Sequence, residues 1–370
     1  MMKTLLLIIF LLLLQTISPI IHYIQPRPQL QVLAAEPAPF VSPPVNISFQ
    51  YDSGEFPIGI AAYGYTPNGS SCTIETTQWL GIVYIDSLSA ISNFQYAPYT
   101  VSFQLNVMLN YEYNGNTYAL WVQNVAEFNT QKDRIHILDA IWNASALNGN
   151  MTGVQGNGKI VPASHSTFYY YCYSASHSVL SLPATIYLLV NLTTNSQGQP
   201  VIYFWYNYGH GWVNYDRVTV TNVVNASDVY FLVENKLTPG YLLYDAALII
   251  GGPGSAADAY IESGKVFFQL FYWNGHNFQE IRNAYDVGYD TGETASNANV
   301  QPYINPLNGE LYTELVVGTS PTLENLWNQY NTTQLTVYSP VNNAYVYVYN
   351  ESLPYSVGTH EAFEVPFTSG

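Results

Sequence analysis

The tripeptide Asp-Ser/Thr-Gly occurs twice in this sequence, at Asp52-Ser53-Gly54 and at Asp290-Thr291-Gly292. Two carboxyl groups that share a water molecule can hydrolyse a peptide bond, because the ionised group takes a proton while the protonated group gives one. Carboxyl groups a few ångström apart do not both ionise easily, so this chemistry suits an acidic medium. It requires neither a metal nor a cofactor, and we expect none.

The residues around the two tripeptides differ from those of pepsin-like enzymes, which place two apolar residues before the aspartate. Here Gln50-Tyr51 and Gly288-Tyr289 precede it. The first tripeptide also lies just after a Pro-rich segment, residues 36–46, which we interpret as an extended linker. Two ordinary turns are therefore the competing interpretation.

Other kinds of catalytic or metal site have less support. No Gly-x-Ser-x-Gly motif accompanies the histidines, and an imidazolium cannot act as a base in acid. Cys72 and Cys172 lack a Cys-x-x-Cys partner, so a metal site is not expected, and either a disulfide or two separate thiols would fit. The histidines show no metal-ligand spacing; those considered are His136, His165, His177, His210 and His276.

The charge composition favours an acidic environment. The chain has 370 residues, 9 Lys and Arg against 25 Asp and Glu, and a net charge of -16 at pH 7. Acid unfolds proteins mainly by protonating carboxylates that are paired in the native state, and a chain with few cations has few such pairs. We interpret this as adaptation to acid, with a generic polar cell-surface protein as the alternative. No basic patch exists for nucleic acid.

The N-terminus resembles a secretory signal. Lys3 precedes the apolar run Leu5–Leu14, which is short for a membrane span of about 20 residues. We predict that residues 1–35 are either an unusually long signal peptide or a shorter one followed by a short pro-segment. We also predict secretion and no stable membrane span afterwards; a retained anchor is the alternative. Eight Asn-x-Ser/Thr sequons suit a glycosylated surface, at Asn46, Asn68, Asn143, Asn150, Asn191, Asn225, Asn331 and Asn350.

Strand signals dominate the rest of the chain. Apolar residues alternate strictly from Val101 to Leu109, which predicts a strand with one buried face, and Asn114-Gly115 predicts a hairpin turn. Residues 251–254, Gly-Gly-Pro-Gly, form a firm break, and only residues 322–330 look helical. We expect an all-β protein of two β-sandwich-like domains, 47–195 and 196–340, followed by a C-terminal strand and tail, 341–370. Substrate would lie in a cleft between the two halves.

Several segments, taken in order, resemble the thermopsin family over about residues 56 to 330. This resemblance implies a secreted, pepstatin-sensitive acid protease of thermoacidophilic archaea that cleaves polypeptides, and we expect a monomer. It supplies no agreed catalytic pair. The segments are Phe56–Gly64, Trp121–Val125, Ile141–Asn143, Tyr215–Thr219, Tyr244–Leu248 with Gly251–Pro253, and Asp290–Thr294.

Two departures from that family bear on activity. Members often carry Asp where this chain has Ala62, and Glu where it has Ala247. If either acid is catalytic, the chain is an inactive relative. A non-catalytic, glycan-binding surface protein is therefore one rival, and a glycoside hydrolase, which would also use two carboxyl groups, is another.

The candidate catalytic acids lie inside or beside the family-like segments. Asp245 falls in an apolar strand, where a partly buried carboxyl would have a raised pKa, although such an aspartate can also be a hydrogen-bonded core residue. Glu293 and Asp290 occupy a polar turn that could equally be solvated. Asp216 and Glu127 are further candidates.

An amide side chain could complete the site in place of a second acid. Gln123 or Asn124 could donate hydrogen bonds to the tetrahedral intermediate, as oxyanion stabilisers do. A Gln–Glu arrangement of the glutamic-peptidase type thus competes with an Asp–Asp pair. The sequence predicts an acid endopeptidase and leaves the pair open.

Overall fold

The computed structural model describes residues 30–32, 56–65, 71–163, 168–281, 284–289, 291–304, 311–321, 326, 335–337, 346–349 and 354–357. The chain forms two units, residues 37–329 and a second unit of residues 1–36 with 330–370. In the second unit β1 (Leu30–Val32) pairs with β23 (Leu335–Val337), and β24 (Val346–Tyr349) pairs with β25 (Pro354–Val357). The expected signal segment, Asp52 and Asp290 lie outside the described residues.

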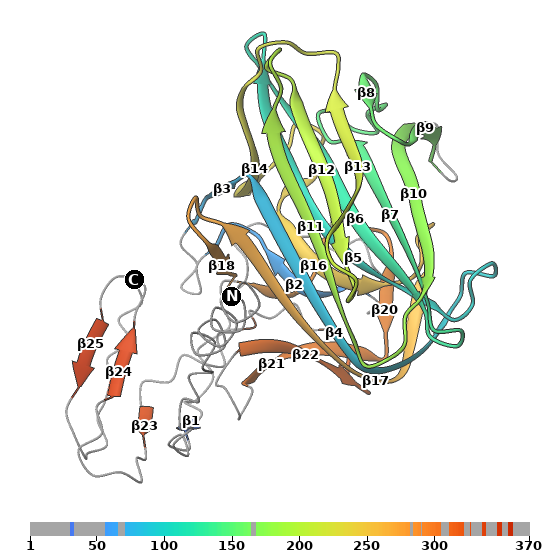
Figure 1. Ribbon diagram of the computed structural model, residues 1–370, viewed down its shortest axis with the longest axis vertical. Helices are drawn as coiled ribbons and strands as arrows, with labels where there is room; N and C mark the ends of the chain where they lie inside the picture. Colours follow the sequence, from blue (N-terminus) through green and yellow to red (C-terminus); the bar gives the residue numbers. More distant parts are fainter. Residues whose placement is uncertain are drawn as a thin grey trace, which may run out of the picture. The chain divides into compact units, whose positions relative to one another are not determined.

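Every regular element of the described residues is a β-strand, which confirms the all-β prediction. No helix in this part of the chain is long and apolar enough to cross a membrane. The predicted helix at residues 322–330 falls almost wholly outside the described residues. The larger unit contains two large sheets (Figure 1).

The first sheet has eleven strands among the described residues. Its main path is β19 (Tyr285–Val287), β2 (Ile58–Ala62), β16 (Ala246–Gly251), β5 (Thr100–Tyr113), β6 (Asn116–Asn129), β7 (Arg134–Asn143), β10 (Tyr169–Val179) and β9 (Lys159–Pro162). Beside this path, β14 (Ser227–Leu237) pairs with β5, β3 (Ile74–Thr76) and β15 (Leu243–Tyr244).

The second sheet has ten strands among the described residues. Its path is β21 (Ala298–Ile304), β22 (Leu311–Val317), β17 (Asp258–Trp273), β4 (Gln78–Ser92), β11 (Ala184–Thr194), β12 (Pro200–Asn207), β13 (Val213–Val220) and β8 (Val154–Gln155). Off this path, β18 (Phe278–Glu280) pairs antiparallel with β17, and β20 (Thr294–Ser296) pairs parallel with it.

Local turn chemistry sets several of these connections. Asn114 and Gly115 both have positive φ, 51° and 74°, as a tight turn between β5 and β6 requires. Strand β16 ends at Gly251, at the predicted Gly-Gly-Pro-Gly break. Position 195 lies in the turn between β11 and β12, which pair within one sheet. A division into domains 47–195 and 196–340 stays a prediction, and it would have to run through both sheets.

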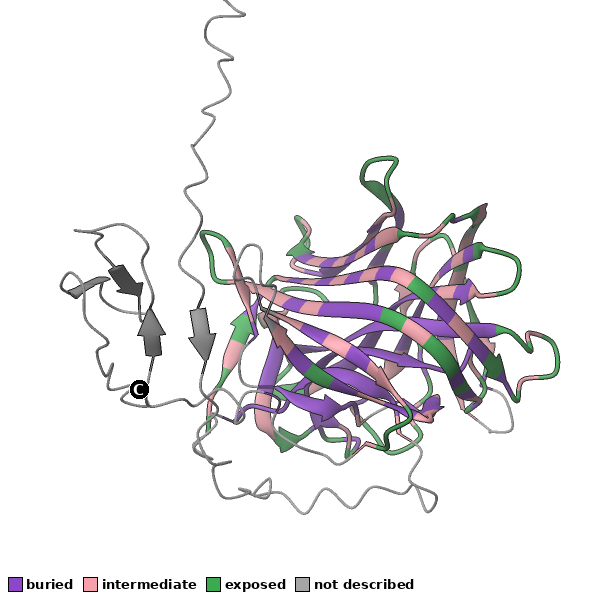
Figure 2. Cartoon of the chain, turned by 90° about the horizontal axis from the view of Figure 1, so that it is seen from below, coloured by how far each residue is buried: buried purple, intermediate pink, exposed green. Residues whose placement is uncertain are grey.

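The two sheets pack face to face through apolar and polar contacts. The rings of Phe103 and Phe268 meet with centroids 6.1 Å apart. The Asn124 amide donates to the Leu189 and Trp205 carbonyls across the interface at 3.0 and 2.9 Å. Residues of β4, β11 and β12 alternate between buried and more exposed positions, as strands with one face on a core do (Figure 2).

Strand β5 departs from this pattern because both of its faces are buried. Its odd-numbered apolar residues are buried, as the alternation predicts. Its even-numbered polar residues are buried as well, with Ser102, Gln104 and Asn106 exposed by only 1%, 3% and 4%. Buried polar side chains require hydrogen-bond partners, so this face of β5 must belong to a polar network.

Candidate functional site

A pocket of about 750 Å³ lies on the outer face of the first sheet, which is turned away from the second sheet. Residues that alternate with the interface residues of β5, β6, β7 and β10 form its floor. Segments from other parts of the chain complete it, at residues 144, 146–149, 163, 168, 240, 242, 253–256 and 292–293. The pocket lies on one sheet, and residues of both predicted halves of the chain line it, so the cleft between the halves stays a prediction.

Gln123, one of the two predicted amide candidates, lies in this pocket on β6 and is only 6% exposed. Its Oε1 accepts a hydrogen bond from the Trp142 indole at 2.6 Å. Its Nε2 donates to Gln104 Oε1 and Asn106 Oδ1 at 3.1 and 3.2 Å. The other candidate, Asn124, points the opposite way, into the interface between the sheets.

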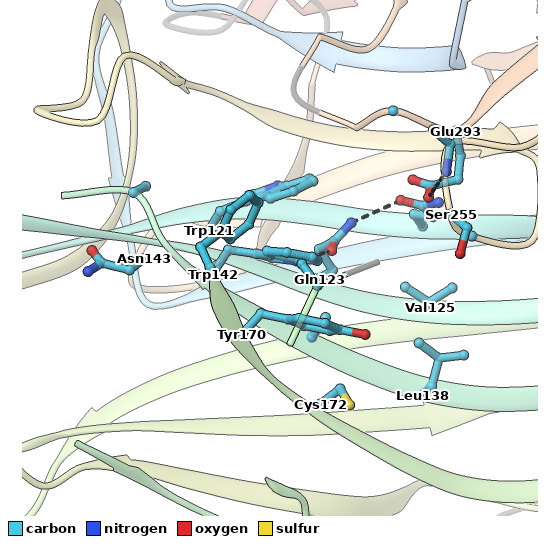
Figure 3. A pocket seen from close by; sticks show the side chains of 18 of the residues that line it. Trp121, Gln123, Val125, Leu138, Trp142, Asn143, Tyr170, Cys172, Ser255 and Glu293 are labelled. Carbon is cyan, nitrogen blue, oxygen red and sulfur yellow. Dashed lines mark hydrogen bonds between the residues drawn. The ribbon is translucent and has the colours of Figure 1, made fainter. Parts of the chain in front are cut away.

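Glu293 is one of two predicted acids that line the same pocket as Gln123 (Figure 3). Its Oε1 accepts from the Ala256 amide at 3.2 Å, and its Oε2 accepts from the Thr291 hydroxyl. Ser255 and Ala256 both have left-handed backbone conformations, with φ of 57° and 54°. Such conformations cost on the order of 1 kcal/mol each and collect at functional sites, and here one of them presents an N–H to Glu293.

The backbone around Glu293 is held by the second sheet. Glu293 directly precedes β20, whose Thr294 and Ser296 hydroxyls donate to the Asp258 carboxylate at 2.9 and 2.7 Å. The Gly252 amide donates to the Thr294 carbonyl at 2.9 Å, and the Thr294 amide donates to the Ala257 carbonyl at 3.0 Å. The position of Glu293 therefore depends on contacts between the Gly-Gly-Pro-Gly segment and β20.

We expect Gly252→Ala to destabilise the fold by about 2 kcal/mol, because a Cβ there would lie 2.2 Å from the Ala257 carbonyl oxygen. Urea unfolding followed by fluorescence measures this change. Gly292→Ala is the matched control, since its added Cβ would meet only Ala256, at 3.3 Å from Cβ and 3.7 Å from Cα, and we expect a smaller loss. Equal losses in the two variants would contradict the packing argument.

Glu127, another predicted acid, also lines the pocket but is engaged with a histidine. His136 Nδ1 lies 2.8 Å from Glu127 Oε2, and His136 Nε2 lies 2.7 Å from Ser174 Oγ. These distances match those of a serine-protease triad. Ser174 does not lie in a Gly-x-Ser-x-Gly motif, so these distances alone do not make it a nucleophile.

Asp216 lies outside the pocket, only 1% exposed, in the interface between the sheets. It accepts from the Asn157 and Arg217 amides at 2.9 and 2.7 Å and from the Tyr171 hydroxyl at 2.5 Å. Beside it on β7 is Asp139, a fully buried carboxyl that sequence reasoning missed. Burial, and secondarily the Asp216 carboxyl, raise the pKa of Asp139 well above its usual value.

The remaining sequence candidates lie away from the pocket lining. Asp245 is 2% exposed and falls between β15 and β16. Ala62 and Ala247, where family members often carry acids, are each 2% exposed and do not line the pocket either. Cys72 and Cys172 are separate thiols, so of the two alternatives the structure has the unbridged one. No cluster of three or more His, Cys, Asp or Glu able to hold a metal occurs in the described ranges.

Comparisons with known proteins agree with the sequence resemblance. The chain is 30% identical to thermopsin of Sulfolobus acidocaldarius over 273 residues, which cover 68% of this chain and 78% of that protein. A crystal structure of scytalido-glutamic peptidase with a transition-state analogue inhibitor matches with a TM-score of 0.36 and 9% identity, over 71% of this chain and 98% of that one. That likeness is too weak to transfer any residue role. The thermopsin family pattern matches residues 43–298, and the chain therefore belongs to the thermopsin family.

Proposed function

We propose that this protein is an acid endopeptidase whose active site is the pocket on the first sheet, with Glu293 as the proton-transferring group and Gln123 as the oxyanion donor. Membership of the thermopsin family supports a peptidase. The observation that carries the residue assignment is that a carboxyl and a fixed amide, 170 positions apart in the chain, line one pocket. Glu127 lines it too but is engaged with His136 at 2.8 Å, whereas Asp245 and Asp216 do not line it.

The proposed reaction uses one carboxyl side chain and one amide side chain. Ionised Glu293 takes a proton from a water molecule, whose oxygen attacks the scissile carbonyl carbon. Gln123 Nε2 donates to the oxyanion that forms. Glu293 then gives its proton to the leaving nitrogen as the C–N bond breaks, which releases a carboxylic acid and an amine.

The working range that we propose is acidic. Within the described residues, carboxylates make three ion pairs, of which Lys236–Glu234 and Lys265–Asp86 involve lysines and the third is Glu127–His136. Acid therefore breaks few native pairs in this part of the chain. The hydrogen bonds of Gln123 come from amide and indole groups, which do not titrate.

We further propose that the protein is secreted and N-glycosylated and acts on unfolded polypeptides. Apolar residues such as Phe168, Leu147 and Leu242 line the pocket and favour apolar substrate side chains. Asn150 and Asn225, two of the predicted sequons, are exposed. Mass spectrometry of the secreted protein tests both the N-terminal cleavage and the glycans.

The direct test is hydrolysis of denatured haemoglobin or casein at pH 2, 4 and 7 by the purified protein, with and without pepstatin. We expect turnover to be confined to acid. Gln123→Ala should lower kcat by about 100-fold, as loss of an oxyanion donor does. Absence of turnover by folded protein at every pH would instead favour the inactive, glycan-binding alternative, which the aromatic pocket wall would suit.

A further inference from the structure

Four side chains under the pocket form a hydrogen-bonded chain with a single direction, which we call the positioning chain: Trp142, Gln123, Gln104 and Ser102. Trp142 Nε1 donates to Gln123 Oε1 at 2.6 Å, and Gln123 Nε2 donates to Gln104 Oε1 at 3.1 Å. Gln104 Nε2 then donates to Ser102 Oγ at 2.9 Å, and Ser102 Oγ donates to the Gly252 carbonyl at 2.6 Å.

The two ends of the positioning chain fix its direction. An indole N–H can only donate a hydrogen bond, and a backbone carbonyl can only accept one. The Gln123 oxygen must therefore face Trp142, and its nitrogen must face β5. The two orientations of a side-chain amide are distinguished by the hydrogen bonds that its oxygen and its nitrogen make. Here the indole makes that distinction.

The positioning chain also connects the two groups that we assign to the reaction, Gln123 and Glu293. Its far end is the carbonyl of Gly252, whose amide holds the Thr294 carbonyl at 2.9 Å, next to Glu293. All four members carry groups that stay neutral in acid, so the orientation of Gln123 does not depend on a carboxylate that acid would protonate.

Gln123 can offer a hydrogen to a substrate only if its two present hydrogen bonds share the other one. Its two acceptors, Gln104 Oε1 and Asn106 Oδ1, both belong to β5 and lie two residues apart on one face. One Nε2–H can bridge them in a three-centre bond. The other is then free to meet the oxyanion.

The indole itself is held by stacking. Its ring lies parallel to that of Tyr170, with centroids 4.0 Å apart and planes at 4°. Trp121, on β6, also contacts the Trp142 indole, with ring centroids 5.9 Å apart. The Nε1 of Trp121 is buried without a hydrogen-bond partner among the described residues. The two tryptophans thus share a surrounding and differ in whether the N–H is used.

We propose that Trp142 is a positioning residue for peptide hydrolysis. Its indole N–H, at one end of the positioning chain, sets the orientation of the Gln123 amide. The inference rests on the proposed function of Gln123. It identifies a role for a residue that sequence reasoning had placed only in a family-like segment, Ile141-Trp142-Asn143.

The test is steady-state kinetics of Trp142→Phe, which keeps an aromatic ring on Tyr170 and removes the N–H. We expect kcat to fall about 10- to 100-fold with KM within about twofold. The reason is that a misoriented Gln123 amide no longer donates to the oxyanion, whose charge develops in the transition state. The pH profile should keep its shape, since no titrating group is removed. Trp121→Phe is the matched control, and because Trp121 also lines the pocket we expect a smaller fall in kcat than in Trp142→Phe, not an unchanged kcat.

Two further variants separate this inference from the proposed function. In a Gln123→Ala background, Trp142→Phe should cause no further loss of kcat, because it acts through Gln123. Ser102→Ala removes the opposite end of the positioning chain and should also lower kcat. It replaces Trp142→Phe as the test if that variant does not fold. Equal kcat losses in Trp142→Phe and Trp121→Phe, or additive losses with Gln123→Ala, overturn the role of Trp142. Full activity of Gln123→Ala alone overturns the proposed function of Gln123.

Discussion

Glu293→Gln should lower kcat for peptide hydrolysis by about 1,000-fold, because the substitution removes the group that takes a proton from water and returns it to the leaving nitrogen. The side chain keeps its size, and its amide oxygen can still accept from the Ala256 N–H, which lies 3.2 Å from Oε1 in the parent. KM should therefore change little. Initial rates on an internally quenched peptide at pH 2 to 4 measure both constants.

Glu127→Gln is the matched control for this prediction, because Glu127 is a second carboxyl in the pocket and is bound to His136 at 2.8 Å. With Glu293 and Gln123 as the reacting pair, Glu127→Gln should retain most of the activity. A loss comparable to that of Glu293→Gln would instead support a carboxyl pair made of the two glutamates. Full activity of Glu293→Gln, with the fold intact, would refute the assignment.

Asp139→Asn should make the free energy of unfolding at neutral pH much larger than that of the parent protein. Asp139 is fully buried on β7 beside Asp216, and burial and that neighbour raise its pKa well above the usual value. The hydroxyls of Tyr171 and Tyr215 and the thiol of Cys172 are the other titratable groups nearby, and burial raises the pKa of each. Asparagine keeps the shape of the side chain and can donate to Asp216 without requiring a proton from solvent.

The sign of the effect follows from proton binding. A group whose pKa is raised in the folded state contributes its full stability below the unfolded pKa, about 3.9 for Asp. That stability is lost as the pH rises through the folded pKa. Over this interval the folded protein holds one more proton than the unfolded chain, so the free energy of unfolding falls by about 1.4 kcal/mol per pH unit.

Urea unfolding of both proteins at pH 3, 5 and 7 measures this dependence. The parent and Asp139→Asn should be similarly stable at pH 3, and the difference between them should grow towards pH 7 in favour of the variant. Asp86→Asn is the control, since Asp86 is 41% exposed and lies 3.8 Å from Lys265, and it should give no such growing difference. A constant difference for Asp139→Asn across the pH range would show that the buried carboxyl does not titrate as we infer.

Local features of the sequence were sufficient for the class of fold and for the family. Alternation from Val101 to Leu109, the Asn114-Gly115 turn and the break after Gly251 act on neighbouring residues, so they can be interpreted without the rest of the chain. The family-like segments can likewise be recognised, in their order along the chain, from the sequence alone. The same patterns placed Gln123 and Glu293 among the candidates.

Which candidates meet in space was decided by the tertiary structure, because the order of strands in a sheet depends on pairings between distant parts of the chain. The path β16–β5–β6–β7 brings Gly252, Ser102, Gln123 and Trp142 into one hydrogen-bonded row, while β20 delivers Glu293 from the second sheet. The polar residues of β5 alternate with apolar ones and so resemble a solvent-facing row, yet the pocket segments cover them. Asp139 looks equally ordinary in sequence, and only the packing of β7 against β13 makes it a buried carboxyl beside another.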